Sequence, residues 1–188
     1  QLGDSLWYFI IIISVFLLSF LGEKIKLISN KKWLYLKNFS IFSFFYLILV
    51  GLVTQLLKHI IGRPRPNYAD LDIGTSFNFF STDASFHSFP SGHSSTIVAI
   101  ALILGLLIPG LRVFFLFLSF VVALSRVVVG AHFTTDIIAG ALVAIILYKI
   151  FLIFLEKRYP DLSVHNFKIK KTSFLLKTNV VFLIIGVF

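Results

Sequence analysis

Residues 137–155 read IIAGALVAIILYKIFLIFL, an apolar stretch that contains one charged residue, Lys149. Crossing the ~30 Å hydrocarbon layer of a bilayer as a helix takes about 20 such residues. Lipid offers the backbone no hydrogen-bond partners, and the stretch lacks the period-two alternation of a membrane barrel strand. It therefore predicts a membrane-spanning helix.

Further apolar stretches of near-spanning length lie on either side of it. Four precede it, at Leu6–Leu21, Phe39–Leu57, Ser94–Ile108 and Val113–Val129, and a partial sixth, Phe174–Phe188, is interrupted by Lys177 and Asn179. A cleaved signal peptide would account for only one of them. The sequence thus predicts an all-α polytopic transmembrane helical bundle, with five clear spans plus a partial sixth, and residues 1–188 forming a single integral membrane domain.

Composition supports a membrane protein. Of the 188 residues, 58% are hydrophobic and 13% are charged, and mean hydropathy is +0.97. Soluble globular domains carry roughly 25% charged residues, and disordered chains are still more polar. The chain has no cysteine, which excludes disulfide frameworks, thiolate metal sites and cysteine nucleophiles.

The distribution of positive charge predicts the orientation. If the spans alternate in direction, 13 of the 17 Lys and Arg residues lie at segments 22–38, 109–112 and 156–173 or at the adjoining helix ends. This excess places those segments in the cytoplasm, and because it is explained by topology it gives no support to a nucleic-acid partner. Only four cations fall on the outer side, where positive residues are disfavoured: Lys58, Arg63, Arg65 and Arg126.

Two of the outer clusters surround helix ends. Pro64 and Pro66 cannot continue a helix, so Lys58 is expected in the last turn of one helix and Arg65 on an extended segment beyond it. Both side chains suit phosphate, although for this stretch alone snorkelling of cations at the membrane interface is the favoured explanation. The second cluster, Pro90-Ser91-Gly92-His93, opens the next helix, where unpaired amides favour anions; a plain Ser N-cap is the alternative.

The third cluster spans residues 125–136. His132 and Asp136 are four residues apart, so on a helix they would share one face, and Arg126 lies six residues before His132. A carboxylate beside an imidazole fixes its tautomer and leaves the other ring nitrogen free to attack, although a simple ion pair is the alternative. Ionisable groups at membrane depth are costly and generally functional. All three clusters fall on the predicted outer side.

Together, Lys58-x6-Arg65-Pro66, Pro90-Ser91-Gly92-His93 and Ser125-Arg126-x5-His132-x3-Asp136 resemble the three signature motifs of the type 2 phosphatidic acid phosphatase (PAP2) superfamily. The resemblance implies that His132 is the nucleophile, that Asp136 orients it and that His93 is the general acid. It also implies a metal-free, cofactor-free reaction in which the phosphate is bound by five residues: Lys58, Arg65, Ser91, Gly92 and Arg126. Family members usually have six spans, so either one precedes residue 1 or the partial sixth completes the set.

The resemblance and the residue chemistry predict a lipid-phosphate phosphatase with a motif core at 58–136 and a phosphohistidine intermediate. The bulk composition suggests a bacterial inner membrane, with the active site on the extracytoplasmic side. Candidate substrates are undecaprenyl diphosphate, phosphatidylglycerophosphate, phosphatidate and lipid A. A lipid phosphotransferase and a non-catalytic anion-binding transporter are the alternatives, and the oligomeric state is left open.

Three weaker features remain. Asp70-x-Asp72 is expected to be a solvated loop rather than a metal site, because no further ligand has suitable spacing. The extracytoplasmic loop 67–89 is rich in Phe and either lies on the membrane surface or covers the helix ends. His59 and Arg63 flank the first motif and are expected at most to support it.

Overall fold

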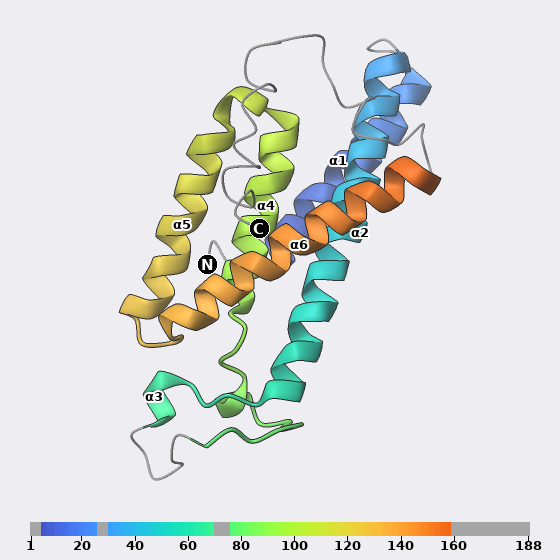
Figure 1. The fold of residues 1–188 in the computed structure, drawn as a ribbon. Helices are drawn as coiled ribbons and strands as arrows, with labels where there is room; N and C mark the ends of the chain where they lie inside the picture. Colours follow the sequence, from blue (N-terminus) through green and yellow to red (C-terminus); the bar gives the residue numbers. More distant parts are fainter. Residues whose placement is uncertain (1–4, 26–29, 70–75, 159–188) are drawn as a thin grey trace.

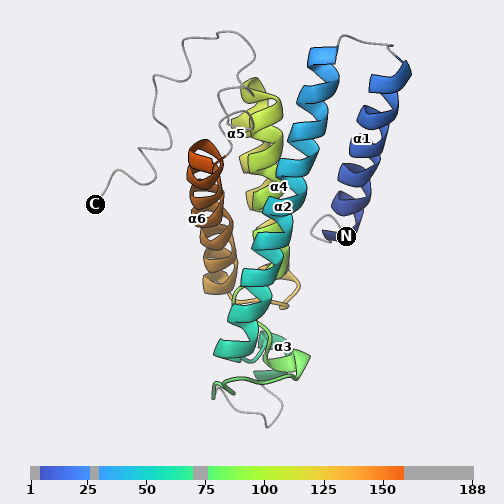
Figure 2. The ribbon, with the colours of Figure 1, turned by 90° about the vertical axis from the view of Figure 1, so that its right-hand side faces the viewer.

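The computed structural model describes residues 5–25, 30–69 and 76–158, and within these ranges it contains helices and irregular segments but no strand. The five long helices are α1 (Ser5–Ile25), α2 (Asn30–Ile61), α4 (Gly92–Leu107), α5 (Arg112–Val128) and α6 (Thr134–Arg158). They run alternately up and down, and α6 lies obliquely across the bundle (Figures 1 and 2). Three short elements connect them: α3 (Pro66–Ala69), η1 (Ala84–Phe86) and η2 (Pro109–Leu111). The all-α prediction is confirmed.

The prediction of five clear spans is too strong. In the described ranges three segments are long and apolar enough to cross a membrane: Leu36–Ile61, Pro109–Val128 and Thr134–Phe154. The apolar parts of α1 and α4, Leu6–Gly22 and Gly92–Leu107, are shorter. Helix α4 lies between two prolines, Pro90 and Pro109, neither of which can continue it. The partial sixth span, Phe174–Phe188, lies outside the described residues.

Two helix boundaries differ from those expected. Helix α2 begins at Asn30, so most of the predicted loop 22–38 is helical. Its Lys and Leu residues are good helix formers, and a membrane helix does not have to end where its apolar part ends. Helix α6 begins at Thr134, which places His132 in the turn before the helix instead of on one helical face with Asp136.

The core lies where α2, α4 and α6 pack together. Tyr46 is fully buried, and its hydroxyl donates to the carbonyl of Ala144, 2.8 Å away, so the phenol ties α2 to α6. Thr54 donates to the hydroxyl of Ser95 at 3.1 Å and joins α2 to α4. The outward side chains of α5 and α6, in contrast, are largely apolar and exposed. An apolar surface of this extent suits lipid rather than water, in keeping with an integral membrane protein.

Backbone pairing fixes the segment after α2 against the second half of the 67–89 loop. The amide of Asn78 donates to the carbonyl of Gly62 at 2.8 Å, that of Arg65 to Ser85 at 2.9 Å, and that of Ser88 to Arg63 at 3.0 Å. Gly62 has φ +55, and a Cβ at this position would lie 1.6 Å from the Asn78 carbonyl oxygen. Only glycine fits there, and the loop is held against the end of α2.

Candidate active site

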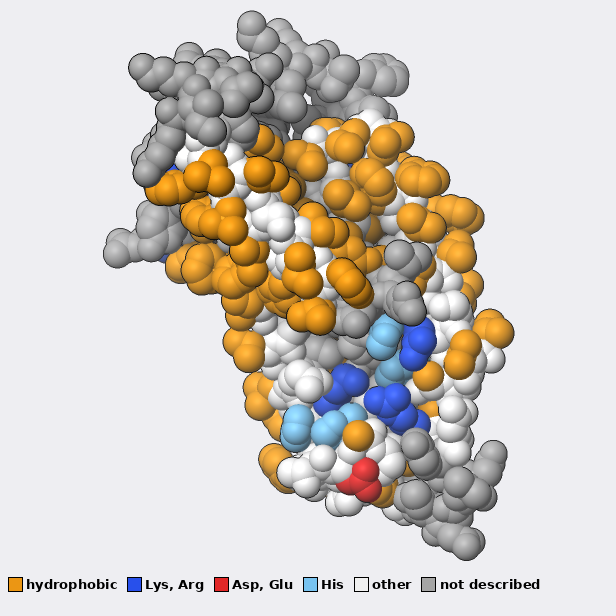
Figure 3. Space-filling model, turned by 180° about the vertical axis from the view of Figure 1, so that it is seen from behind, with side chains coloured by type: hydrophobic (Ala, Val, Ile, Leu, Met, Phe, Trp, Pro, Cys, Tyr) orange, Lys and Arg blue, Asp and Glu red, His pale blue; other side chains and the backbone are white. Residues whose placement is uncertain are grey.

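All eight predicted site residues lie at one end of the bundle, where α2 and α5 end and where α4 and α6 begin (Figure 1). Viewed from behind, Lys, Arg and His side chains gather on this end, below a broad apolar surface (Figure 3). The alternating directions of the helices bring the four helix ends together. Segments up to 78 residues apart in the sequence thereby meet in one polar region.

His132 is held by the backbone of two other segments. Only 3% of the residue is exposed, its amide donates to the carbonyl of Arg126, and its Nδ1 lies 2.8 Å from the carbonyl oxygen of Ser88. Because a carbonyl can only accept, Nδ1 carries the proton and Nε2 carries the lone pair. Nε2 is therefore the nitrogen that is able to attack an electrophile.

Asp136 is fully buried and satisfied by three donors. One carboxylate oxygen accepts from the Ser88 hydroxyl at 2.6 Å and from the Phe133 amide at 2.9 Å, and the other accepts from Arg63 at 2.7 Å. The distance from the carboxylate to Nδ1 of His132 is 3.7 Å, longer than a hydrogen bond. The tautomer is thus fixed directly by the Ser88 carbonyl, and Asp136 contributes a nearby charge and holds Ser88 in place.

Lys58 and the start of α4 lie side by side. Lys58 is 7% exposed, and its ammonium donates to the carbonyl of His87 at 3.0 Å. A Cβ on Gly92 would lie 3.8 Å from Nζ, so the absence of a side chain there leaves room beside the ammonium. His93 is half-buried and lies within electrostatic range of Arg126, His132 and Lys58. Both imidazoles and the two cations therefore lie close enough to influence one another electrostatically.

Ser91 caps helix α4 from a fully buried position. Its amide donates to the carbonyl of Asp136 at 2.9 Å, which joins the starts of α4 and α6. Its side-chain oxygen accepts from the amide and the hydroxyl of Ser94. The N-cap that was the alternative for this cluster is therefore present, and the capping oxygen still has its own proton to donate.

The two remaining cations differ in their partners. Nε of Arg65 donates to the carbonyl of Ala84 at 3.2 Å, and the guanidinium lies within electrostatic range of Lys58. Nε of Arg126 is buried and has no hydrogen-bond partner within the described residues. A buried donor without a partner is costly and calls for an explanation, such as a catalytic role or a bound ion.

The site as a whole is electropositive. Asp136 is already paired with Arg63, so Lys58, Arg65 and Arg126 are left without a carboxylate partner among the described ion pairs. The nearby Asp83 is exposed and bound to its own loop, where the Ser85 amide donates to it and lowers the pKa of that carboxyl. Three cations and a helix N-terminus are suited to bind a compact anion with several oxygens.

Two contributors to this site lie outside the eight predicted residues: Arg63, which was expected at most to support the first motif, and Ser88, which was not predicted. Arg63 binds both Asp136 and the hydroxyl of Thr135, the latter at 2.6 Å, and stacks over the ring of Phe133 at 4.1 Å. Its signals in the sequence were its place beside the first motif and its positive charge on the side where cations are disfavoured. Ser88 acts through a backbone carbonyl and a hydroxyl, and the sequence carries no signal for either.

The described residues contain no group of three or more His, Asp or Glu side chains arranged to hold a metal ion. Asp70 and Asp72, which were expected to be solvated, lie outside the described residues.

A family model and several named relatives match this chain. The model of the PAP2 superfamily matches residues 39–160. The chain is 40% identical over 141 residues to a lipid A 1-phosphatase of Rhizobium etli, covering 73% of this chain and 60% of that protein. It is 39% identical over 141 residues to a lipid A 1-phosphatase of Rhizobium johnstonii, covering 73% of this chain and 57% of that protein.

A more distant relative has a different name. The chain is 28% identical over 101 residues to the bacitracin transport permease protein BcrC of Bacillus licheniformis, covering 54% of this chain and 50% of that protein. This chain therefore spans about 60% or less of the length of these relatives. No solved structure matches it.

Proposed function

The chain belongs to the PAP2 superfamily, and from this membership and the site geometry we propose that it is a membrane lipid phosphatase. The observation that carries the proposal is the position of His132. Its protonated Nδ1 is held by the Ser88 carbonyl, so a lone pair remains on Nε2 in a region with three cations that lack carboxylate partners. Such an arrangement suits attack on a phosphorus atom whose oxygens carry negative charge.

The proposed reaction has two steps. In the first, Nε2 of His132 attacks phosphorus while the bond to the leaving oxygen breaks, and His93 donates a proton to that oxygen. In the second, His93 takes a proton from water as the water oxygen attacks the phosphohistidine, which releases inorganic phosphate and restores both imidazoles. The reaction therefore needs His132 neutral and His93 protonated at the outset.

The phosphate would be held by groups that surround its oxygens. We propose that Lys58, Arg65 and Arg126 neutralise them, and that Ser91 and the amide of Gly92 donate hydrogen bonds from the start of α4. Asp136 would stabilise the imidazolium that forms on His132 during transfer. Because the cations supply the charge neutralisation, no metal ion is required.

For the substrate, the names of the relatives favour the 1-phosphate of lipid A. Undecaprenyl diphosphate, phosphatidylglycerophosphate and phosphatidate present the same phosphate chemistry beside an apolar tail. We further propose a bacterial inner membrane location with the site on the extracytoplasmic side, because the predicted outer segments carry four of the 17 cations.

The test is phosphate release by the purified protein from a panel of these four lipids, compared between wild type and His132→Ala. Loss of the nucleophile should lower kcat by roughly a thousandfold or more. His59→Ala is the matched control, because His59 lies near the same end and has no proposed role in the reaction. If His132→Ala retained full activity, the nucleophile assignment would be wrong.

The same panel separates the alternatives. A phosphotransferase would release little phosphate until an acceptor alcohol was added, and then would yield a new phosphate ester. An anion-binding transporter would release none from any lipid.

A further inference from the structure

Three phenylalanines are exposed on one turn of the 67–89 loop. Phe77, Phe79 and Phe80 are 49%, 65% and 74% exposed, and the rings of Phe77 and Phe79 stack with their centroids 6.2 Å apart. We call residues 77–81 the phenylalanine turn. Aromatic rings carry a large apolar area, and a cluster of them on a surface marks a place where a protein meets an apolar partner.

The backbone of the phenylalanine turn keeps these rings on the outside. The amide of Ser81 donates to the carbonyl of Asn78 at 3.3 Å, so residues 78–81 form a β-turn with Phe79 and Phe80 at its centre. Phe80 has φ +58, a conformation that glycine or asparagine normally occupies at this position and that is strained for a bulky side chain. A strained residue that also exposes an aromatic ring points to a function for that ring.

The phenylalanine turn is attached to the end of α2. The amide of Phe80 donates to the carbonyl of Ile60 at 3.4 Å, and the amide of Asn78 donates to that of Gly62 at 2.8 Å. Carbonyls at the end of a helix have no partner within the helix, and these two bonds satisfy them. The end of α2 therefore determines where the turn lies.

The length of the apolar part of α2 gives the level of the turn in the membrane. This part runs over Leu36–Ile61, 26 residues that rise about 39 Å. It is longer than the ~30 Å hydrocarbon layer and close to the ~40–45 Å of a bilayer with its headgroups. An apolar helix of this length has its ends among the headgroups, and the phenylalanine turn lies at one of these ends.

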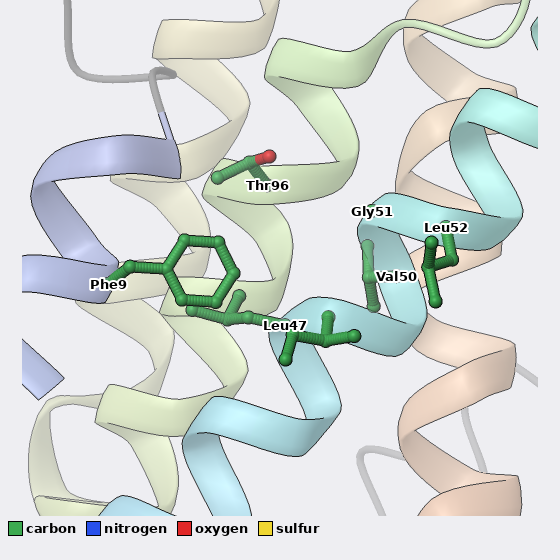
Figure 4. A pocket seen from close by; sticks show the side chains of 7 residues that line it. Phe9, Leu47, Val50, Gly51, Leu52 and Thr96 are labelled. Carbon is green, nitrogen blue, oxygen red and sulfur yellow. The ribbon is translucent and has the colours of Figure 1, made fainter. Parts of the chain in front are cut away.

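A stripe of exposed apolar side chains on α2 leads to the turn. Leu52 lines an apolar cavity between α1, α2 and α4 (Figure 4), and Leu56 and Ile60 follow it at intervals of four residues. All three are exposed, and residues four apart share one face of a helix. Within a membrane span, an exposed apolar stripe faces lipid. Because the carbonyl of Ile60 accepts from Phe80, the phenylalanine turn continues this stripe beyond the helix.

We propose that the phenylalanine turn is a membrane anchor, which inserts the rings of Phe77, Phe79 and Phe80 among the lipid headgroups on the side of the active site. There the rings contact the upper parts of the acyl chains and leave water. The partner is the lipid surface, and not a second protein, because the turn continues a stripe that already faces lipid.

The anchored loop also reaches the active site. The carbonyl of His87 accepts from the ammonium of Lys58, and the carbonyl of Ser88 accepts from Nδ1 of His132. The anchor thus holds these two carbonyls at a fixed depth, close to the level of the lipid phosphates.

The test is the depth of a single tryptophan in reconstituted vesicles. The chain has two tryptophans, Trp7 and Trp33, and both are replaced by phenylalanine. Phe79→Trp is then compared with Thr82→Trp, the matched control, because Thr82 is polar, exposed and on the same loop. One quencher is phosphatidylcholine brominated near the glycerol end of its acyl chains, and the other is acrylamide dissolved in the water.

Brominated lipid should lower the emission of Phe79→Trp by about twofold or more and that of Thr82→Trp only slightly, and acrylamide should act in the reverse order. Quenching of Phe79→Trp by acrylamide as strong as that of Thr82→Trp would show that the turn lies in water and would overturn the proposal. Protection of Phe79→Trp from both quenchers would place it against protein and would overturn the proposal too.

Phe77→Trp, measured in the same way, decides the question if Phe79→Trp does not fold. None of these measurements involves catalysis. A failure of the anchor therefore leaves the phosphatase assignment in place, and a failure of the phosphatase assignment leaves the anchor in place.

Discussion

Arg63 supports the site although it occupies none of the defining positions of the three motifs. It bonds to the fully buried Asp136 while its own side chain remains 23% exposed. Removing one partner of a buried ion pair leaves an uncompensated charge, which is strongly destabilising. Arg63 thus holds the Asp136 carboxylate in place. That carboxylate in turn holds Ser88, whose carbonyl fixes the tautomer of His132.

Arg63→Met should therefore destabilise the protein by about 2–3 kcal/mol, less than for a fully buried pair because the guanidinium is partly exposed. Thermal unfolding of the detergent-purified protein measures this effect. Asp136→Asn on the Arg63→Met background is the control: it removes the unpaired charge and should recover much of the lost stability. Independent, additive effects of the two substitutions would contradict the coupling.

Arg63 also shows what residue-level sequence reasoning could and could not provide. The positions of Lys58, His93, Arg126 and His132 along alternating spans were enough to predict that these residues lie at one end of the bundle. The partners of Asp136 could not be predicted in this way, because Arg63 lies 73 positions and Ser88 lies 48 positions from it in the sequence. Such contacts depend on how the helices pack, and no local pattern encodes them.

At the scale of helices, the close approach of α6 to the start of α4 determines where the phosphate seat lies. A Cβ on Gly140 would lie 2.4 Å from the carbonyl oxygen of Ser91 and 3.1 Å from the amide of Ser95. A side chain there would push α4 away from α6 and break the hydrogen bond between Ser91 and Asp136. Gly140 is thus a packing requirement of the site.

Gly140→Ala should destabilise the protein by about 1–3 kcal/mol and reduce activity, although alanine is the better helix former. The matched control is Gly51→Ala, also inside a long helix but facing open space, which should be neutral or stabilising by up to about 1 kcal/mol. Unfolding midpoints and phosphate release are measured for both variants. If the two variants had the same unfolding midpoint and the same rate of phosphate release, the packing argument would be wrong.

Helix positions were predicted better than helix ends. Apolar runs located α1, α2, α4, α5 and α6, because burial in lipid requires such runs. The start of α2 at Asn30 was missed, and α6 begins at Thr134, three residues before the predicted span at 137–155. Polar helical turns outside the apolar part, such as the first turns of α2 and α6, do not appear in the hydropathy pattern.

At the scale of the whole molecule, the predicted orientation places the site outside the cytoplasm. The chain has no cysteine, so single cysteines report on topology without background labelling. Thr82 and Gly110 are exposed at opposite ends of the bundle. A membrane-impermeant maleimide should label Thr82→Cys in intact spheroplasts. It should label Gly110→Cys only after the membrane has been permeabilised. The reverse pattern would show that the site faces the cytoplasm.

The shortness of α4 has a consequence for how water reaches the site. Its 16 residues rise about 24 Å, some 6 Å less than a typical hydrocarbon layer, and its first residues are the polar groups of the site. Because most of α4 is buried within the bundle, these polar groups are enclosed mainly by protein, and water should reach His93 from the outer face more readily where the bilayer is thinner. We expect faster turnover in vesicles of short-chain lipids than in thicker ones, measured with the same substrate at equal surface density; a rate independent of membrane thickness would contradict this account.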